Sequence, residues 1–178
     1  MGDDWKEVRL FYHNTWDKVA IEKSGLLERS KQNTKGWHTL ADTGEATPPG
    51  VWLSLTLLDG QLPSFSPEEY GPDRVIINSL RVFDMVHGPV LYVGKERYSK
   101  QGFKLIRLFL ARSSDLQSIQ WCTRNKLEKV PVADNNYLCW NPVLNKWSTM
   151  SEPNTMVEVF VPYDIDLTNC RWQKVGCV

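Results

Sequence analysis

Short segments with the residue pattern of β-strands, separated by polar stretches rich in glycine and proline, most constrain what this chain can fold into. The first of them alternates along its length, as a strand with two different faces does. Strands are predicted at Val8–His13, Val51–Leu55, Arg74–Asn78, Pro89–Gly94, Phe103–Ala111, Met156–Val161 and Arg171–Val175. Many strands and few helices indicate an α+β fold with a mixed or antiparallel sheet core, rather than a wound βαβ sheet.

Two helices are predicted between these strands. The first follows the opening strand directly, because Asn14 or Thr15 can cap it, Asp17 suits its positive first turn and Gly25 can end it in a left-handed conformation. Its apolar side chains recur at helical spacing, at Trp16, Val19 and Ala20. The second helix is predicted over Asp115–Leu127, and one side of it carries Leu116, Ile119, Thr123 and Leu127.

Length and composition exclude several classes of protein. The chain has 178 residues, with 21 Lys plus Arg and 21 Asp plus Glu, and no internal linker divides it, so residues 1–178 are expected to form one domain. Zero net charge argues against a domain whose main task is to grip a phosphate backbone. The longest apolar runs fall far short of the ~20 residues that span a bilayer, and the amino terminus is acidic and polar. We therefore expect a cytoplasmic protein without a membrane partner.

The cysteine and histidine positions do not predict a metal site. The chain has four cysteines, with no Cys-x-x-Cys pair, and its three histidines lie far from them in sequence. Without a secretory signal, the cysteines are expected to be reduced thiols.

Glu158 is the most unusual residue in any predicted strand. Its neighbours on the same strand face are Met156 and Phe160, and burying an unpaired carboxylate there would cost several kcal/mol. Glu158 therefore requires a partner or a cleft. Two further segments are candidates for the same functional site. They are the strand that ends in His13 and passes into the first helix, and Gly50-Val51-Trp52-Leu53-Ser54.

In this order the segments resemble the His-Tyr-Glu ADP-ribosyltransferases, the group that contains the poly(ADP-ribose) polymerases. The resemblance lies in strand-His-x-Thr followed by a helix, then Gly-Val-aromatic-Leu-Ser, and a late strand bearing Glu before a Tyr-Asp-Ile turn. The chain also resembles the domain family found at the carboxy terminus of phytanoyl-CoA hydroxylase-interacting protein, a domain with no established enzymatic activity. That resemblance lies in Leu10-Phe11-Tyr12, Gly50-Val51-Trp52-Leu53-Ser54, Leu91-Tyr92-Val93-Gly94, 134–138, and Val157-Glu158-Val159 with Asp166-Leu167.

The first resemblance implies an ADP-ribosyltransferase-like domain that takes NAD as substrate. Glu158 would stabilise the oxocarbenium-like state formed when the nicotinamide bond breaks, and His13 would bind a ribose hydroxyl. Trp52 would stack on the nicotinamide. The implied catalytic residues are Glu158 and His13, and the implied NAD-binding residues are His13, Asn14, Thr15, Trp52 and Ser54. The acceptor of ADP-ribose stays open between protein, nucleic acid and water.

Two departures from the family pattern leave a second hypothesis open. Asn14 stands where the family usually has Gly, and Trp52 where it usually has Tyr, so the nicotinamide slot is expected to be narrower. The alternative is a catalytically inactive module of the same fold that acts through protein contacts.

Weaker signals lie elsewhere in the chain. A basic cluster around Tyr98 could face nucleic acid, although a solvated hairpin is the simpler interpretation. His38 could be a second site histidine of the kind used by RNA 2′-phosphotransferases, but the Arg and His pattern of that family is not visible. Of the eight tryptophans, Trp16 and Trp172 are expected to pack near the cleft, and Trp37, Trp140 and Trp147 to form a partner surface or lid.

Overall fold

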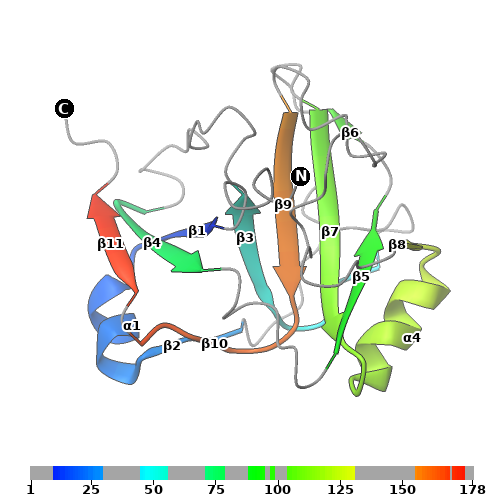
Figure 1. The fold of residues 1–178 in the computed structure, drawn as a ribbon, viewed down its shortest axis with the longest axis horizontal. Helices are drawn as coiled ribbons and strands as arrows, with labels where there is room; N and C mark the ends of the chain where they lie inside the picture. Colours follow the sequence, from blue (N-terminus) through cyan, green and yellow to red (C-terminus); the bar gives the residue numbers. More distant parts are fainter. Residues whose placement is uncertain are drawn as a thin grey trace, which may run out of the picture.

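The computed structural model describes residues 10–29, 45–55, 71–78, 88–94, 97–98, 104–130, 155–168 and 170–174. They form an α+β fold built on a mixed β-sheet with two helices (Figure 1). The strands of the main sheet are β1 (Leu10–Thr15), β3 (Val51–Leu55), β4 (Asp73–Asn78), β5 (Pro89–Val93), β6 (Arg97–Tyr98), β7 (Lys104–Arg112), β8 (Glu128–Val130), β9 (Thr155–Val161) and β11 (Arg171–Lys174).

The order of strands in this sheet is β11-β4-β1-β3-β9-β7-β5-β8, and β6 pairs with β7. All neighbours are antiparallel except β7 and β9, which run parallel. A smaller antiparallel sheet joins β2 (Leu26–Leu27) to β10 (Ile165–Asp166). Strands from the start, middle and end of the chain therefore lie side by side at the centre of the main sheet.

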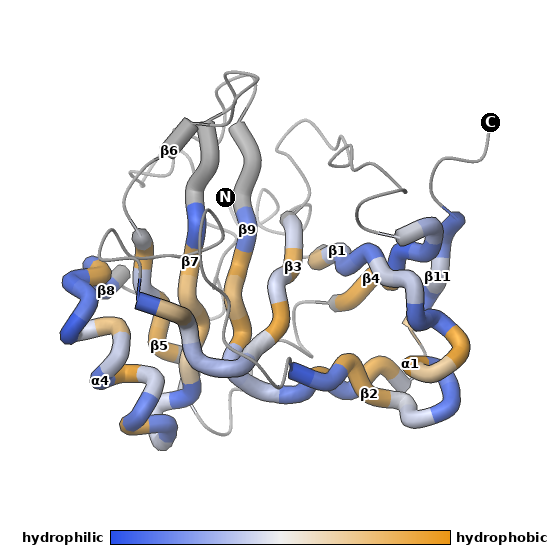
Figure 2. The backbone as a smooth tube through the Cα atoms, turned by 180° about the vertical axis from the view of Figure 1, so that it is seen from behind, coloured by the Kyte–Doolittle hydropathy of each residue, from blue (hydrophilic) through white to orange (hydrophobic). Residues whose placement is uncertain are grey.

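Both faces of the main sheet are buried, each against its own hydrophobic core. The first core contains Phe11, Leu53 and Val159, and it is closed by the small sheet and by Ile21 of helix α1 (Lys18–Ser24). The second core lies on the opposite face, where Phe109 and Phe160 pack against Trp121 of helix α4 (Leu116–Arg124). Figure 2 shows hydrophobic segments concentrated along the central strands β3, β9 and β7.

Helix α1 begins later than predicted. The ladder between β1 and β4 continues to Thr15, so Asn14 and Thr15 belong to the strand and Asp17 takes the N-cap position. The shift changes which side of the helix meets the sheet: Val19 is 81% and Trp16 60% exposed, so the predicted packing role of Trp16 is wrong. The helix ends at Gly25 in the predicted left-handed conformation, with φ of 73°.

Helix α4 starts where the sequence predicted and ends earlier. The Asp115 carboxylate caps it by accepting from the Ser118 backbone N–H. The predicted side is buried only in part: Ile119 packs against the second core and Leu127 is buried there, but Leu116 is 66% exposed. The helix itself buries Ser118, Trp121 and Cys122. Trp121 stacks on Phe109 of β7, and this aromatic pair fixes the rotation of the helix on the sheet.

The remaining strand predictions agree with the structure within one or two residues, over the positions that it describes. Arg97 and Tyr98 of the basic cluster pair with the start of β7, as in the hairpin interpretation. Trp172 is partly buried against the first core, with Lys18 Nζ 5.5 Å from its ring centroid. The predicted roles of Trp37, His38, Trp140 and Trp147 lie outside the described residues. Neither described helix has the length and apolarity needed to cross a membrane.

Candidate functional site

The residues singled out by sequence come from three strands that are adjacent in the sheet. His13 lies on β1, Trp52 on β3 and Glu158 on β9, and β3 pairs with both of its neighbours. These strands are separated in sequence by long segments, and the fold brings them together at the centre of the sheet (Figure 1).

His13 contacts the backbone of β3 rather than the other site side chains. Its Nδ1 lies 2.8 Å from the carbonyl oxygen of Trp52. A carbonyl only accepts, so Nδ1 carries the proton and Nε2 of the neutral ring is an acceptor. Burial lowers the pKa of His13, although the bond to Trp52 opposes that shift, so burial favours this neutral form.

The sheet register places His13 on the opposite face from the other candidates. His13 is paired with Val75, which belongs to the first core, whereas Asn14 is paired with Arg74 on the other face. In the ladder between β1 and β3, Phe11 pairs with Leu55 and Tyr12 with Ser54. One residue further along β1, the hydrogen bond from His13 Nδ1 to the Trp52 carbonyl oxygen joins the two strands.

Polar side chains cross the second face of the sheet in one continuous row. Tyr12 is the register partner of Ser54, Ser54 of Glu158, and Glu158 of Arg107 on β7. Tyr12, Ser54 and Arg107 are buried, with exposed fractions of 4%, 8% and 3%. In Figure 2, hydrophilic segments of β9 and β7 lie side by side just beyond the hydrophobic part of each strand.

Arg107 is the partner that the sequence required for Glu158. Its Nε donates to Oε2 of Glu158 at 3.2 Å, and the two side chains are only 4% and 22% exposed. Burial raises the pKa of Glu158, while the charge of Arg107 and its hydrogen bond act in the opposite direction. The guanidinium therefore stabilises the ionised carboxylate in a place where solvent does not.

Trp52 lies between this polar row and the second core. Its ring meets Phe160 edge-on at a centroid distance of 5.1 Å, and the Arg107 guanidinium carbon lies 5.8 Å from its centroid. The Trp52 ring is thus shared between an aromatic partner and a cation. Its indole Nε1 is buried without a hydrogen-bond partner among the residues that the structure describes.

Asn14 lies on the same face as Trp52 and is oriented by Arg74. The Arg74 Nε donates to Asn14 Oδ1 at 3.0 Å, and this bond identifies which end of the amide is oxygen. Arg74 is 4% exposed and its guanidinium lies 5.7 Å from the Tyr12 ring centroid. The Asn14 Nδ2 is also buried with no partner in the described part of the chain.

Of the predicted NAD-binding residues, Thr15 has a local structural contact. Its hydroxyl accepts from the Asp17 backbone N–H at 3.0 Å, forming a turn between β1 and α1. By strand alternation it lies on the face of His13, away from Ser54 and Trp52. The structure therefore groups Asn14, Trp52, Ser54 and Glu158 on one face, and His13 and Thr15 on the other.

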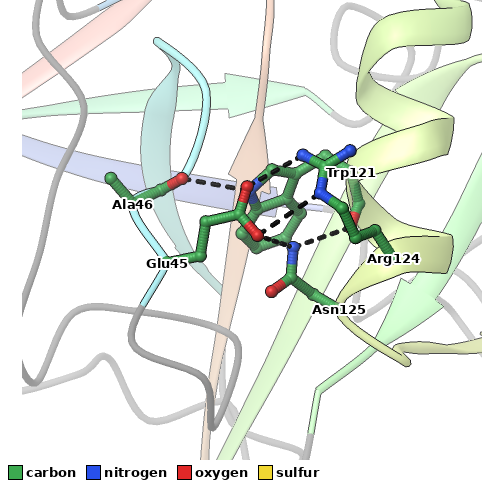
Figure 3. A network of polar contacts seen from close by, with 5 residues as sticks. All are labelled: Glu45, Ala46, Trp121, Arg124 and Asn125. Carbon is green, nitrogen blue, oxygen red and sulfur yellow. Dashed lines mark hydrogen bonds and ion pairs between the residues drawn. The ribbon is translucent and has the colours of Figure 1, made fainter.

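The segment that precedes β3, at Glu45 and Ala46, is hydrogen-bonded to helix α4 and to Asn125 at its C-cap. The Trp121 Nε1 donates to the carbonyl oxygen of Ala46 at 3.0 Å (Figure 3). The Glu45 carboxylate accepts from Arg124 Nη2 and from Asn125 Nδ2, each at 2.8 Å. These contacts hold the chain just before β3 begins at Val51, one residue ahead of Trp52.

Gly50 allows this entry to run close to β9. A Cβ at position 50 would collide with the Phe160 ring and lie 2.7 Å from the Val161 carbonyl oxygen. The glycine that the sequence places two residues before Trp52 is therefore required by packing.

Sequence reasoning missed Arg107, Arg74 and Tyr12. The signal was present for Arg107, because it interrupts an apolar strand in the way that Glu158 does. No sequence pattern indicates that Arg107 and Glu158 are register partners on neighbouring strands.

The structure adds little to the thiol and metal predictions. Cys122 and Cys170 are free thiols, the first fully buried. Within the described residues, no group of His, Cys, Asp and Glu side chains could hold a metal ion.

Comparisons of the chain with protein-family models, with curated proteins and with solved structures find no match.

Proposed function

We propose that this chain is an ADP-ribosyltransferase-like domain that binds NAD and transfers ADP-ribose to an acceptor. The observation that carries the proposal is the adjacency of β1, β3 and β9, since the residues implied by the family resemblance lie on these neighbouring strands. The register pairing of Ser54 with Glu158 adds support, as does the common face of Asn14, Trp52, Ser54 and Glu158.

Glu158 is the group that would act on the reacting bond. Cleavage between nicotinamide and ribose develops positive charge on the ribose, and a fixed carboxylate interacts more strongly with that state than with the ground state. Arg107 contributes by opposing the rise in the pKa of Glu158 that burial causes, and so favours the ionised carboxylate. His13 lies on the opposite face of the sheet and contributes indirectly, because its bond to the Trp52 carbonyl holds β1 against β3.

The test is turnover of NAD labelled in either half of the molecule. Wild-type protein is expected to release nicotinamide and to transfer or liberate ADP-ribose above the buffer rate. Glu158→Gln should reduce that rate at least about a hundredfold, because it removes the charge and keeps the shape. Glu128→Gln is the matched control, since Glu128 is an exposed acid at the start of β8. Equal rates for wild type and buffer would end the enzymatic proposal.

A second function is favoured by one observation, the engagement of Glu158 and Trp52 by Arg107. An arginine that neutralises the carboxylate also weakens its attraction for a developing cation. The corresponding proposal is a catalytically inactive module of the same fold that acts through protein contacts. It predicts no change in melting temperature when NAD is added, whereas a ligand that binds only the folded state must raise it. An NAD-dependent rise of several degrees would contradict the second function.

A further inference from the structure

Two buried hydrogen-bond donors without partners lie on the same face of the sheet, at the point where β1 and β3 stop pairing. They are Asn14 Nδ2 and Trp52 Nε1, and neither has an acceptor among the described residues. Tyr12 and Ser54 are the last register partners recorded in this direction. Asn14 lies two residues after Tyr12, and Trp52 lies two residues before Ser54. Because the pair is antiparallel, the same register would set Asn14 and Trp52 opposite one another.

Both groups can only donate. The indole has a single N–H and no acceptor. The Asn14 amide has an acceptor of its own, but that oxygen already receives the Arg74 Nε at 3.0 Å, which leaves Nδ2 directed elsewhere. An unpaired buried donor destabilises the fold, so two of them in one place are not explained by a purely structural role.

The bond from Arg74 to Asn14 also adjusts the strength of this donor. A guanidinium that donates to the amide oxygen polarises the amide and makes its N–H a better donor, and the low exposure of Arg74 strengthens that effect. The positive charge of Arg74 therefore strengthens the hydrogen bond that Asn14 Nδ2 can donate to a ligand atom. Glu158, the nearest carboxylate on this face by register, is compensated by Arg107.

From these contacts we infer that Asn14 and Trp52 form a subsite for a ligand oxygen that only accepts, namely the oxygen of a carboxylate or phosphate group. Such an oxygen would satisfy both donors and gain charge-assisted hydrogen bonds, which are about twice as strong as neutral ones. A carboxamide brings the same carbonyl oxygen but no charge. The inference deepens the proposed function, on which it rests for the identity of the site, by assigning the site a preference for the acid form of a ligand.

The experiment is calorimetric titration of the full chain with small probes that differ in one group. Nicotinate is expected to bind about tenfold more tightly than nicotinamide, a ratio that corresponds to one stronger hydrogen bond. Inorganic phosphate is titrated separately, and binding of phosphate but not of nicotinate would assign the subsite to a phosphate group. NAD and its nicotinic acid analogue are compared in the same way.

Two substitutions remove one donor each and leave the fold intact. Asn14→Asp keeps an acceptor for Arg74 but replaces the free N–H by an oxygen, and Trp52→Phe keeps a ring against Phe160 but removes the indole N–H. Each should abolish the preference for nicotinate. Trp172→Phe, on the opposite face of the sheet, is the control and should leave the preference unchanged.

The outcomes separate this inference from the proposed function. If nicotinamide binds as tightly as nicotinate while NAD is turned over in a Glu158-dependent way, the subsite inference is wrong and the function stands. If nicotinate binds with the expected variant pattern but NAD is never turned over, the subsite stands and the enzymatic function fails. If neither nicotinate nor phosphate binds, the inference is wrong, because the two donors then bind water at most.

Discussion

Replacing Arg107 by methionine should destabilise the fold more than any other single change in the polar row. Methionine has a similar length and no charge, so the substitution leaves Glu158 without the donor that lies 3.2 Å away. Breaking a fully buried ion pair costs about 3–5 kcal/mol, and an exposed one about 0–1 kcal/mol. Since the two side chains are 4% and 22% exposed, we take the lower end of the buried range, about 3 kcal/mol. For a chain of this size that is a fall in melting temperature of about 6–12 °C.

The assay is urea denaturation followed by circular dichroism, at about pH 7.5 and about pH 5. Burial raises the pKa of Glu158, so its contribution to stability is greatest when it is protonated and declines as the pH rises above the unfolded-state value. Without Arg107 the pKa of Glu158 should rise further. The destabilisation of Arg107→Met should therefore be larger at about pH 7.5 than at about pH 5.

Two further variants complete this test. In Arg107→Met/Glu158→Leu both charges are absent, and the loss of stability should be smaller than in Arg107→Met alone. Glu22→Gln disrupts an exposed pair with Lys18 on helix α1 and should change stability by about 0.5 kcal/mol or less. A cost below about 1 kcal/mol for Arg107→Met, or a double variant that is simply the sum of its singles, would refute the reasoning.

Three other predictions concern the parts that position the site. Burial lowers the pKa of His13, so its contribution to stability is present above about pH 6.5 and is lost as the pH falls; the stability difference between wild type and His13→Gln should shrink with acid, as pH-dependent denaturation would measure. Trp121→Phe keeps the stacked ring but leaves the Ala46 carbonyl without its donor, and should cost about 1–2 kcal/mol in the same denaturation assay. Gly71→Ala combines a φ of 104° with a Cβ that would lie 2.6 Å from a backbone nitrogen, so thermal melting should show a larger loss than for Gly25→Ala, whose Cβ meets nothing within 4 Å.

The fold class could be predicted because strand signals are local. Alternation in β1, the apolar run of β7 and the glycine that ends α1 each depend on residues close in sequence, and all three agree with the structure. The predicted helix faces were only partly right, for a tertiary reason. Helix α4 turns Trp121 toward the sheet because its ring stacks on Phe109 of β7. No property of the helix sequence indicates that contact.

The composition of the site was only partly predictable, for the same reason. Glu158 could be identified as a residue in need of a partner from its apolar neighbours alone. That the partner is Arg107 depends on the parallel register of β7 and β9, strands connected through helix α4 and β8. The orientation of His13, away from the other candidates, follows from strand alternation and from the pairing of β1 with both β4 and β3. The sequence does not indicate that pairing.

The central claim, that Asn14, Trp52, Ser54 and Glu158 form one NAD site on a single face of the sheet, is tested most directly by calorimetric titration of NAD. The titrated proteins are the wild type, Trp52→Ala and Trp172→Ala. These two tryptophans lie on opposite faces of the same sheet. The account predicts binding of one NAD per chain, weakened at least about tenfold by Trp52→Ala and unchanged by Trp172→Ala. Absence of binding to the wild-type protein, or equal affinities for all three proteins, would contradict it.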